Sequence, residues 1–328
     1  MPNARRFTLV CNPAARDSIA RAAEARDALV AAGRDVVVLH SESPEHARDL
    51  ARDAARDADG VVVAVGGDGT IGDVVNGILD AGASAPFGLI PSGTGNDTAK
   101  GLRVPIGLRG AVDVLLHSAA RPADVLVAND RPFLGLGTLG FAADVGRSVN
   151  AWKAGPWRLT ARALGRHLYR VTAAHHLLFR SAPFNCTVRA PDTTRGAFEW
   201  TGAALTVLIG NQPGVGGVFL PCPAATGDDG LLDVCIVRSR GPHGPLTLAQ
   251  KARTLQAAVA GMHVELPWVD YFQAPGEVTF ALDGQAAFVS DGDWRGDVGE
   301  LRVRPWASAL RIVAPPTPAT PPGAPPAV

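Results

Sequence analysis

The sequence has no uninterrupted apolar stretch of about 18 residues, the length that a membrane-spanning helix needs. Met1 to Thr8 also lacks the apolar run of a secretory signal peptide. Only four cysteines occur and none stands in a C-x-x-C pair, so a zinc knuckle is not expected. Buried thiols in a reducing compartment fit this cysteine content. These absences predict a cytoplasmic protein.

A net charge is also missing, because 31 Lys and Arg residues balance 31 Asp and Glu residues. Neutrality argues against a protein that coats nucleic acid, so no nucleic-acid partner is expected. Hydrophobic residues make up 47% and charged residues 19% of the chain, which excludes a wholly disordered protein. The 328 residues predict about two domains, at roughly 100–200 residues each.

Short apolar runs alternate with Ala- and Arg-rich segments in the first third of the chain. This alternation predicts βαβ units and a parallel sheet covered on both faces. The expected strands are 8–11, 36–39, 61–65 and 88–90, and the expected helices are 18–32, 44–57 and 71–81. Ligands in such sheets bind at the carboxyl ends of the strands. Asn12, Gly66 to Thr70 and Pro91 to Asp97 all fall there.

Strand-like runs separated by Gly- and Pro-rich turns dominate after about Asp124. They predict an antiparallel sandwich or barrel, interrupted by a helical insertion from about Pro156 to His176. The expected strands are 125–127, 184–188, 204–209, 232–237, 278–282 and 301–303. The Pro-rich tail, residues 316–328, is predicted to be disordered.

Three glycines surround Asp68 in the segment Gly66 to Thr70, directly after a buried strand. They allow a sharp turn and a close approach of phosphate oxygens to backbone amides, at the positive end of the next helix. A carboxylate in such a site would repel phosphate, so Asp68 suggests a magnesium ion shared with a nucleotide. The alternative is a plain strand-to-helix turn with Asp68 as the N-cap.

Pro91 to Asp97 forms a second loop of this kind after the next strand. Its hydroxyl, amide and carboxylate groups suit phosphate, ribose or a hydrated metal. Alone, it could equally be a turn ending in a helix cap at Asn96 or Asp97. Two such loops at neighbouring strand ends favour a nucleotide site.

These segments together resemble the diacylglycerol kinase catalytic family, which includes soluble bacterial lipid kinases and the sphingosine and ceramide kinases. The resemblance extends to about Pro315. Its motifs are Asn12-Pro13, Gly66 to Thr70, Asp73 to Gly77, Pro91 to Asp97, Asp124, Gly140-Phe141, Asn211, Gly216-Gly217, Asp229 to Asp233 and an Asp-Gly-acid tripeptide.

The resemblance implies ATP- and magnesium-dependent phosphorylation of a lipid hydroxyl, with diacylglycerol as the expected substrate and phosphatidic acid as the product. It also implies a fold of class α/β plus all-β: a doubly wound nucleotide-binding domain over 1–124 and a β-sandwich lipid-substrate domain over 125–303. It allows residues from about 304 to 315 to return to the first domain. In the family, the nucleotide lies in the cleft between the two domains.

The family's functional positions map onto residues of both predicted loops. The implied nucleotide-binding residues are Asn12, Gly66, Gly67, Asp68, Gly69, Thr70, Ser92, Gly93, Thr94 and Asn96. The implied ligands of the catalytic magnesium network are Asp68, Asp97 and Asp124. Asp68 is therefore also expected to be catalytic.

The sequence departs from the family at the base, which is usually the Glu of an Asp-Gly-Glu tripeptide. The two candidates are Asp283-Gly284-Gln285 and Asp291-Gly292-Asp293. Gln285 cannot usefully accept a proton, whereas the carboxylate of Asp293 can. Asp293 is therefore the predicted base, and the alternative is a solvated turn residue.

A structural magnesium occurs in some bacterial members, in the segment that matches Thr226 to Leu231. Asp229 would bind it through its side chain, and Thr226 and Leu231 through backbone carbonyls. A simple turn in this Asp-rich stretch is an equal alternative.

Val145 to Pro191 contains eight basic residues and no acidic residue. Arg158, Arg162, Arg166 and Arg170 recur every four residues and would share one side of a helix, where like charges disfavour an isolated helix. An amphipathic helix of this kind suits an anionic lipid surface. The prediction is peripheral association with the inner face of the membrane, and the alternative is a solvated helix paired with acids elsewhere.

Two other functions remain open. One is NAD kinase-like phosphorylation of a soluble nucleotide, against which the Pro91 to Asp97 loop and the Asp229-Gly230 segment weigh. The other is a lipid- or nucleotide-binding protein that has lost catalysis at the Asp-Gly-Glu position. A homodimer is left open as well.

Overall fold

The chain folds into two compact units in a computed structural model that describes residues 6–15, 17–57, 59–82, 85–93, 95–155, 167–179, 182–215 and 218–316. The first unit comprises the chain up to Asp124 and a second segment that begins at Ser308. The second unit extends from Val125 to Ala307. Within the described ranges, no helix is long and apolar enough to cross a membrane.

The first unit is built around a parallel sheet. Its strands are β1 (Arg6–Cys11), β2 (Asp35–His40), β3 (Gly60–Gly66) and β4 (Phe87–Pro91). They are hydrogen-bonded in the order β4–β3–β1–β2, and Ile312 from the end of the chain pairs with Phe87 on the other side of β4. Every residue of β3 is buried, as expected for an apolar strand covered on both faces.

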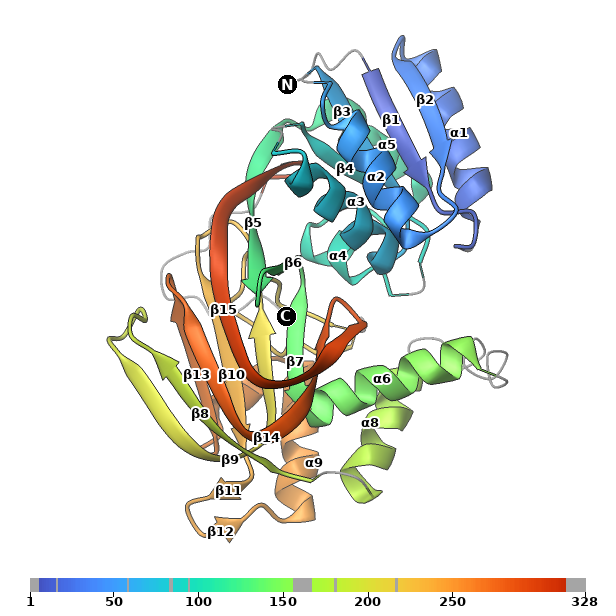
Figure 1. The fold of residues 1–328 in the computed structure, drawn as a ribbon. Coiled ribbons are helices and arrows are strands. Elements are labelled where there is room, and N and C mark those ends of the chain that lie inside the picture. Colours follow the sequence, from blue (N-terminus) through green and yellow to red (C-terminus); the bar gives the residue numbers. More distant parts are fainter. Residues whose placement is uncertain are drawn as a thin grey trace. The chain divides into compact units, whose positions relative to one another are not determined.

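Helices follow these strands and cover the sheet. They are α1 (Ser18–Ala31), α2 (Pro44–Ala54), α3 (Asp68–Asp80), α4 (Asp97–Gly101) and α5 (Leu108–His117). α1 contacts α5 and α2 contacts α3, and Figure 1 shows the two pairs on opposite faces of the sheet. Gly33, with a φ of 76°, follows the end of α1, where a left-handed residue commonly terminates a helix. The doubly wound α/β prediction is confirmed.

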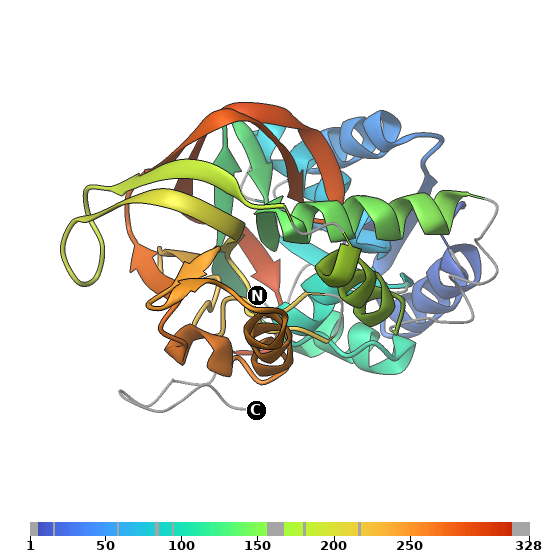
Figure 2. The same ribbon diagram turned by 90° about the horizontal axis from the view of Figure 1, so that it is seen from below.

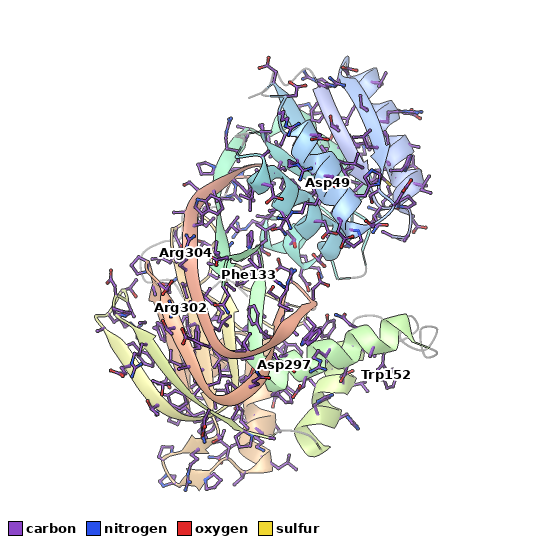
Figure 3. The ribbon with its side chains drawn as sticks, viewed as in Figure 1. Asp49, Phe133, Trp152, Asp297, Arg302 and Arg304 are labelled. Atoms are coloured by element: carbon purple, nitrogen blue, oxygen red, sulfur yellow. The ribbon has the colours of Figure 1, made fainter. Side chains whose placement is uncertain are left out.

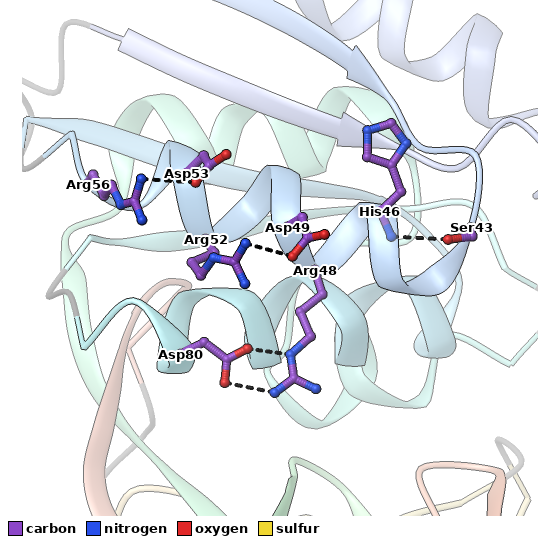
Figure 4. Close-up of polar contacts among 8 residues, drawn as sticks. All are labelled: Ser43, His46, Arg48, Asp49, Arg52, Asp53, Arg56 and Asp80. Carbon is purple, nitrogen blue, oxygen red and sulfur yellow. Dashed lines mark hydrogen bonds and ion pairs between the residues drawn. The ribbon is translucent and has the colours of Figure 1, made fainter.

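A close backbone contact joins α2 to α3. A Cβ atom added to Gly77 of α3 would lie 2.2 Å from the carbonyl oxygen of Arg48 in α2, so no side chain fits there. The Arg48 guanidinium also pairs with both carboxylate oxygens of Asp80, and this hydrogen bonding lowers the pKa of Asp80 below its ordinary value. Figure 4 shows this pair together with Arg52–Asp49 in α2, Arg56–Asp53 at the end of α2, and the N-cap contact of Ser43 with His46.

The second unit is an antiparallel β-sandwich. Its strands are β5 (Ala120–Ala128), which begins in the first unit, β6 (Arg131–Phe133), β7 (Leu136–Gly140), β8 (Phe184–Ala190), β9 (Phe198–Gly210), β10 (Leu232–Arg238), β11 (Arg240–Gly241), β12 (Gly244–Pro245), β13 (Val269–Ala274), β14 (Val278–Ser290) and β15 (Asp293–Val313), which ends in the first unit. β9 and β14 are long, and each pairs with β8 at one end and with β7 at the other. This shared pairing curves the sheet.

The sandwich has apolar side chains on both faces of its central strands. Along β10, Leu232, Val234 and Ile236 enter one buried cluster, whereas Cys235 and Val237 enter another. The alternation is the two-residue period of a strand. Phe133, labelled in Figure 3, packs edge-on against Phe288 in the first cluster, with 6.3 Å between ring centroids. The predicted β-sandwich is confirmed.

Helices are inserted between the strands of the second unit. They are α6 (Phe141–Ala154), α8 (His167–Phe179), α9 (Leu248–Val259) and the 3₁₀ helix η1 (Met262–Glu265). Figures 1 and 2 both show α6 and α8 side by side. The predicted insertion from Pro156 to His176 overlaps α8, but residues 156–166 lie outside the described residues. α9 was not predicted, although Thr247 and Gln250 form a capping box at its start.

The contact at Gly77 generates a prediction about stability. Gly77→Ala should lower the free energy of unfolding by about 1–3 kcal/mol, because the added methyl group overlaps the backbone of α2. Gly72→Ala is the matched control, since a Cβ atom there meets nothing within 4 Å in the same helix. It should be neutral or raise stability by up to about 1 kcal/mol through helix propensity. Urea unfolding measures both, and equal stability of the two variants would contradict the prediction.

Candidate active site

The two predicted glycine loops lie against each other at the carboxyl ends of β3 and β4. The Ser92 amide donates a hydrogen bond to the Gly66 carbonyl oxygen at 2.8 Å. A Cβ atom added to Gly93 would lie 2.7 Å from the Cα atom of Gly67. Only glycine allows the two backbones to approach this closely. The loops therefore form one continuous backbone surface.

Asn12 and Thr70 meet beside this surface, although they are far apart in the sequence. Asn12 follows β1, and its Nδ2 donates a hydrogen bond to Thr70 Oγ1 at 3.2 Å. Its Oδ1 accepts a hydrogen bond from the amide of Ala14 at 2.9 Å. Gly66 is needed here, because its Cβ atom would lie 2.5 Å from that of Thr70. The structure thus brings together Asn12 and the predicted loop from Gly66 to Thr70.

Asp68 and Asp97 approach a common point. Asp68 is the first residue of α3, after the N-cap Gly67, so the alternative that Asp68 itself is the N-cap is wrong. Its Oδ1 accepts a hydrogen bond from the Thr98 amide at 2.9 Å. A Cβ atom placed on Gly95 would lie 3.1 Å from Asp68 Oδ2 and 3.5 Å from Asp97 Oδ2. The two carboxylates therefore face the same space above the second loop.

Two carboxylates at this place suit a magnesium ion that also binds phosphate. Magnesium in nucleotide sites usually takes one or two protein carboxylates and completes its shell with water and phosphate oxygens. Among the described residues, no group of three or more His, Cys, Asp or Glu side chains could hold a metal alone. The donor set of Asp68 and Asp97 therefore fits a metal that arrives with the nucleotide.

The remaining residues of the second loop hold its shape. Asn96 has a φ of 51°, and its side chain accepts from the Gly93 amide and donates to the Gly93 carbonyl, both at 2.8 Å. The amide of Asn96 is thus committed to the loop. Ser92 Oγ is buried and has no hydrogen-bond partner among the described residues. Thr94 lies outside the described residues.

Asp124 is buried away from solvent, with 2% of its surface exposed. Its Oδ1 accepts a hydrogen bond at 2.7 Å from the amide of Ser308, which has a φ of 54°. This contact fixes the point where the chain returns to the first unit. Its predicted support of the magnesium network stays a prediction.

Asp293 lies just after the turn of the β14–β15 hairpin, formed by Asp291 and Gly292 with φ values of 51° and 86°. The carboxylate of Asp291 is occupied, because it accepts hydrogen bonds from the amides of Leu134 at 2.8 Å and Gly135 at 2.7 Å. The Asp293 side chain is 58% exposed, and Arg295 Nη2 lies 3.9 Å from its Oδ2. The hairpin is thus fixed by Asp291 and presents Asp293 to solvent.

An apolar cavity of about 160 Å³ lies within the second unit and reaches this hairpin. Side chains from the sheet and from α6, α8 and α9 line it, with Phe141, Val145 and Leu255 among them. Val289 and Gly292 of the hairpin also belong to its wall. The cavity therefore ends beside the residue that precedes Asp293.

The other Asp-Gly tripeptide and the predicted structural-magnesium segment, Thr226 to Leu231, do not line this cavity. Asp283, Gly284 and Gln285 are exposed where β14 changes register, and none of them lines the apolar cavity. In the second segment, Asp229 Oδ1 accepts a hydrogen bond from the Leu231 amide at 3.0 Å. Thr226 Oγ1 is buried without a hydrogen-bond partner in the part of the chain that is described. The structural magnesium stays a prediction.

Several contacts that support the site were not predicted. Lys100 Nζ donates to the Gly95 carbonyl at 2.6 Å and lies 3.4 Å from Asp97 Oδ1, so the positive charge of this lysine lies beside the second loop. Arg21 of α1 donates to the carbonyl of Pro91. The Asp97–Lys100 spacing on one helix could have indicated the first contact. The second joins residues 70 positions apart and leaves no local signal.

Two family models match this chain. The diacylglycerol kinase catalytic domain matches residues 6–128, and the YegS C-terminal NAD kinase beta sandwich-like domain matches residues 135–314. The chain belongs to the diacylglycerol kinase family, in its YegS-like branch. It is therefore a phosphotransferase with an alcohol acceptor, as the sequence predicts.

Individual proteins agree with this membership. A Pseudomonas fluorescens protein named "Probable lipid kinase YegS-like" is 30% identical over 307 residues, 92% of each chain. A Yersinia pestis protein of the same name is 30% identical over 270 residues, 80% of this chain and 85% of its own. The crystal structure of a diacylglycerol kinase from Bacillus anthracis has a TM-score of 0.70 at 18% identity, covering 95% of this chain and 97% of that chain. The last comparison shows the shared fold.

The hydrogen bond of Asp68 makes its role testable. Asp68→Asn keeps an oxygen that can accept from the Thr98 amide but removes the negative charge. We expect an unfolding free energy close to that of the wild type and a loss of kinase activity of roughly 100-fold or more. Asp68→Ala should lose activity and also about 1 kcal/mol or more of stability. A fully active Asp68→Asn variant would contradict the predicted role of the charge.

Proposed function

We propose that this enzyme transfers the γ-phosphoryl group of ATP to the hydroxyl group of a membrane lipid, with diacylglycerol as acceptor and phosphatidic acid as product. The observation that carries the proposal is the apolar cavity, because its wall includes Gly292, next to Asp293. An apolar chain held there would have its polar end beside a carboxylate that can accept a proton. The named relatives, which are called probable lipid kinases, support this acceptor class.

The proposed nucleotide site consists of the two glycine loops. Backbone amides of the first loop and the start of α3 would bind phosphate oxygens, where the helix carries partial positive charge. Asn12 and Thr70 would add polar side chains beside this surface, and Ser92, whose Oγ is buried, stays a predicted nucleotide-binding residue. These groups hold the nucleotide in place and leave its last phosphate for transfer.

Asp68 and Asp97 are the residues that would hold magnesium. When bound, the ion would neutralise charge on the β- and γ-phosphates, which is its general contribution to phosphoryl transfer. Lys100 would offset the charge of Asp97 on the other side. With magnesium bound and Lys100 beside Asp97, the two carboxylates would add no net repulsion to the phosphates.

Asp293 would accept the proton of the lipid hydroxyl as its oxygen attacks phosphorus. Its exposure is suited to this role, because the side chain is not committed to a buried partner. Arg295 Nη2 lies 3.9 Å from Asp293 Oδ2, so its positive charge would attract the carboxylate. Catalysis then requires the hydroxyl held by the second unit to reach the phosphate held by the first.

The alternative functions find less support. An NAD kinase-like acceptor is a polar nucleotide, which gains nothing from an apolar cavity next to the base. The match to an NAD kinase-like sandwich describes the fold of the second unit and not its substrate. A protein without catalysis would have no need to keep Asp293 accessible.

Membrane association belongs to the same proposal. The basic residues Arg158, Arg162 and Arg166 lie outside the described residues, and Arg170 is exposed on α8. These charges would hold the enzyme peripherally at the inner face of an anionic membrane, where its substrate is dissolved. A homodimer is compatible with this arrangement and is not required by it.

Asp293→Asn tests the proposed base. We expect kcat to fall by about 10²–10⁴-fold, because the amide cannot take the proton, while nucleotide binding stays at its wild-type affinity. The measurement is transfer of labelled phosphate to diacylglycerol and to a panel of other lipids, with NAD included and with and without magnesium.

Asp283→Asn is the matched control for this change. It removes the same charge from the other Asp-Gly tripeptide, which lies away from the cavity, and should leave kcat within about twofold of the wild type. Activity that survives in Asp293→Asn, or is lost equally in both variants, would exclude Asp293 as the base. Transfer to NAD in place of lipids would reject the acceptor class.

The membrane interaction is tested with vesicles that contain anionic phospholipid. Replacing Arg158, Arg162, Arg166 and Arg170 with Gln should weaken binding, at about 1 kcal/mol for each charge near the surface. Sedimentation with vesicles of neutral phosphatidylcholine, with and without phosphatidylglycerol, measures the change. Unchanged binding to the anionic vesicles would reject these residues as the membrane contact.

A further inference from the structure

A polar pocket lies between α6 and α8. Its volume is about 670 Å³, and its described lining residues are Asp144, Arg147, Ser148, Ala151 and His176. The first four are spaced as one face of α6. The other face of the helix, with Phe141 and Val145, lines the apolar cavity, so α6 separates the two. None of the pocket residues belongs to the proposed nucleotide site or to the proposed base.

Ser148 and His176 form a prearranged hydrogen-bonding pair in this pocket. Ser148 Oγ lies 2.8 Å from His176 Nε2, and His176 is only 4% exposed. When His176 donates through Nε2, the Ser148 oxygen accepts, and its own O–H can donate to a group in the pocket. A serine that joins α6 to a nearly buried histidine on α8 is a fixed donor, not a mobile surface hydroxyl.

Arg147 adds a positive charge whose N–H groups are available. Its guanidinium lies 5.5 Å from the ring centroid of the exposed Trp294. This places a positive charge over an aromatic ring, and the N–H groups of Arg147 can also donate to an acceptor. Among the described residues, no carboxylate lies within ion-pair distance of Arg147. Among the described residues, the Arg147 charge is therefore held beside Trp294 without an ion-pair partner.

We propose that this pocket binds a phosphate group, with Arg147 supplying charge-assisted hydrogen bonds and Ser148, oriented by His176, supplying a third donor. The planar fork of an arginine together with a hydroxyl matches the several oxygens of a tetrahedral phosphate. The surrounding sequence favours an anion, because Val145 to Pro191 has eight basic and no acidic residues. The phosphate could belong to a lipid headgroup or to a soluble molecule.

Asp144 lines the same pocket and provides a second, opposite test of the proposal. Its carboxylate also lines the pocket and carries the same sign of charge as phosphate, so it must weaken phosphate binding. Removal of Arg147 and removal of Asp144 should then change the affinity in opposite directions. A perturbation of the fold would not produce this pattern.

The pocket is connected to the hairpin that carries Asp293. Arg147 contacts Trp294, and Asn150, also on α6, donates a hydrogen bond to the Gly292 carbonyl. A bound phosphate would thus hold Arg147, which packs on Trp294. Trp294 directly follows Asp293 in the sequence. Trp152 is exposed further along the same helix (Figure 3) and provides, with Trp294, a fluorescence signal in this region.

The test is phosphate binding by the full-length protein without ATP, measured by phosphorus NMR titration with inorganic phosphate. Arg147→Gln should weaken binding by roughly tenfold or more, as expected for loss of a charge-assisted hydrogen bond. Asp144→Asn should strengthen binding severalfold. Arg253→Gln is the charge-matched control, because Arg253 is exposed on α9 and does not line the pocket, and its affinity should equal that of the wild type.

A second arm distinguishes the source of the phosphate. Vesicles of phosphatidylcholine with and without phosphatidic acid are sedimented with the same variants. Opposite shifts for Arg147→Gln and Asp144→Asn with inorganic phosphate support a site for soluble phosphate. The same shifts confined to vesicles with phosphatidic acid support a headgroup site. Any other pattern in both arms overturns the proposal, and since no turnover is measured, the result is independent of the kinase reaction.

Discussion

The contact between the backbones of Gly67 and Gly93 is the constraint on which the first unit's chemistry depends. It joins two loops that leave neighbouring strands, and it leaves no room for a side chain between them. Because the loops touch, Asp68 at the start of α3 can accept a hydrogen bond from the backbone amide of Thr98 at the start of α4. The same approach directs Asp68 and Asp97 to one point. Glycine here allows two backbones to pack closely, and the proposed phosphate-binding surface depends on that packing.

In the second unit, an exposed carboxylate, that of Asp293, follows a residue that lines an apolar cavity. Asp291 accepts two amide hydrogen bonds from the chain before β7, so the hairpin turn is tied to the sheet. The Asp293 side chain, two residues later, is 58% exposed. Of these two aspartates, Asp291 holds the turn because its oxygens are occupied, and Asp293 is the exposed carboxylate that the proposed function uses.

The sequence was sufficient for the features that depend on local patterns. Buried runs such as Val61 to Val65 and the glycine loops that follow them predicted the strands, the loop positions and the α/β class, because each is encoded within a few residues. α9 was not predicted, because the strand-like runs on either side dominate the pattern there, although seven of its twelve residues are Leu, Ala or Val. The hydrogen bond between Asp124 and Ser308 joins residues 184 positions apart, and no local pattern can indicate such a contact.

The two Asp-Gly tripeptides differ both in sequence and in what surrounds them in the fold. The sequence favours Asp293 because Gln285 cannot usefully accept a proton. Gly292 of the second tripeptide lines the apolar cavity and no residue of the first does, which is in keeping with the proposed role of Asp293. An acyl chain bound as proposed would gain about 0.8 kcal/mol for each buried CH₂ group, so the cavity would set the position of the chain's polar end. Under the same proposal, selectivity for the lipid would arise from the wall of the cavity, and proton transfer from the hairpin that borders it.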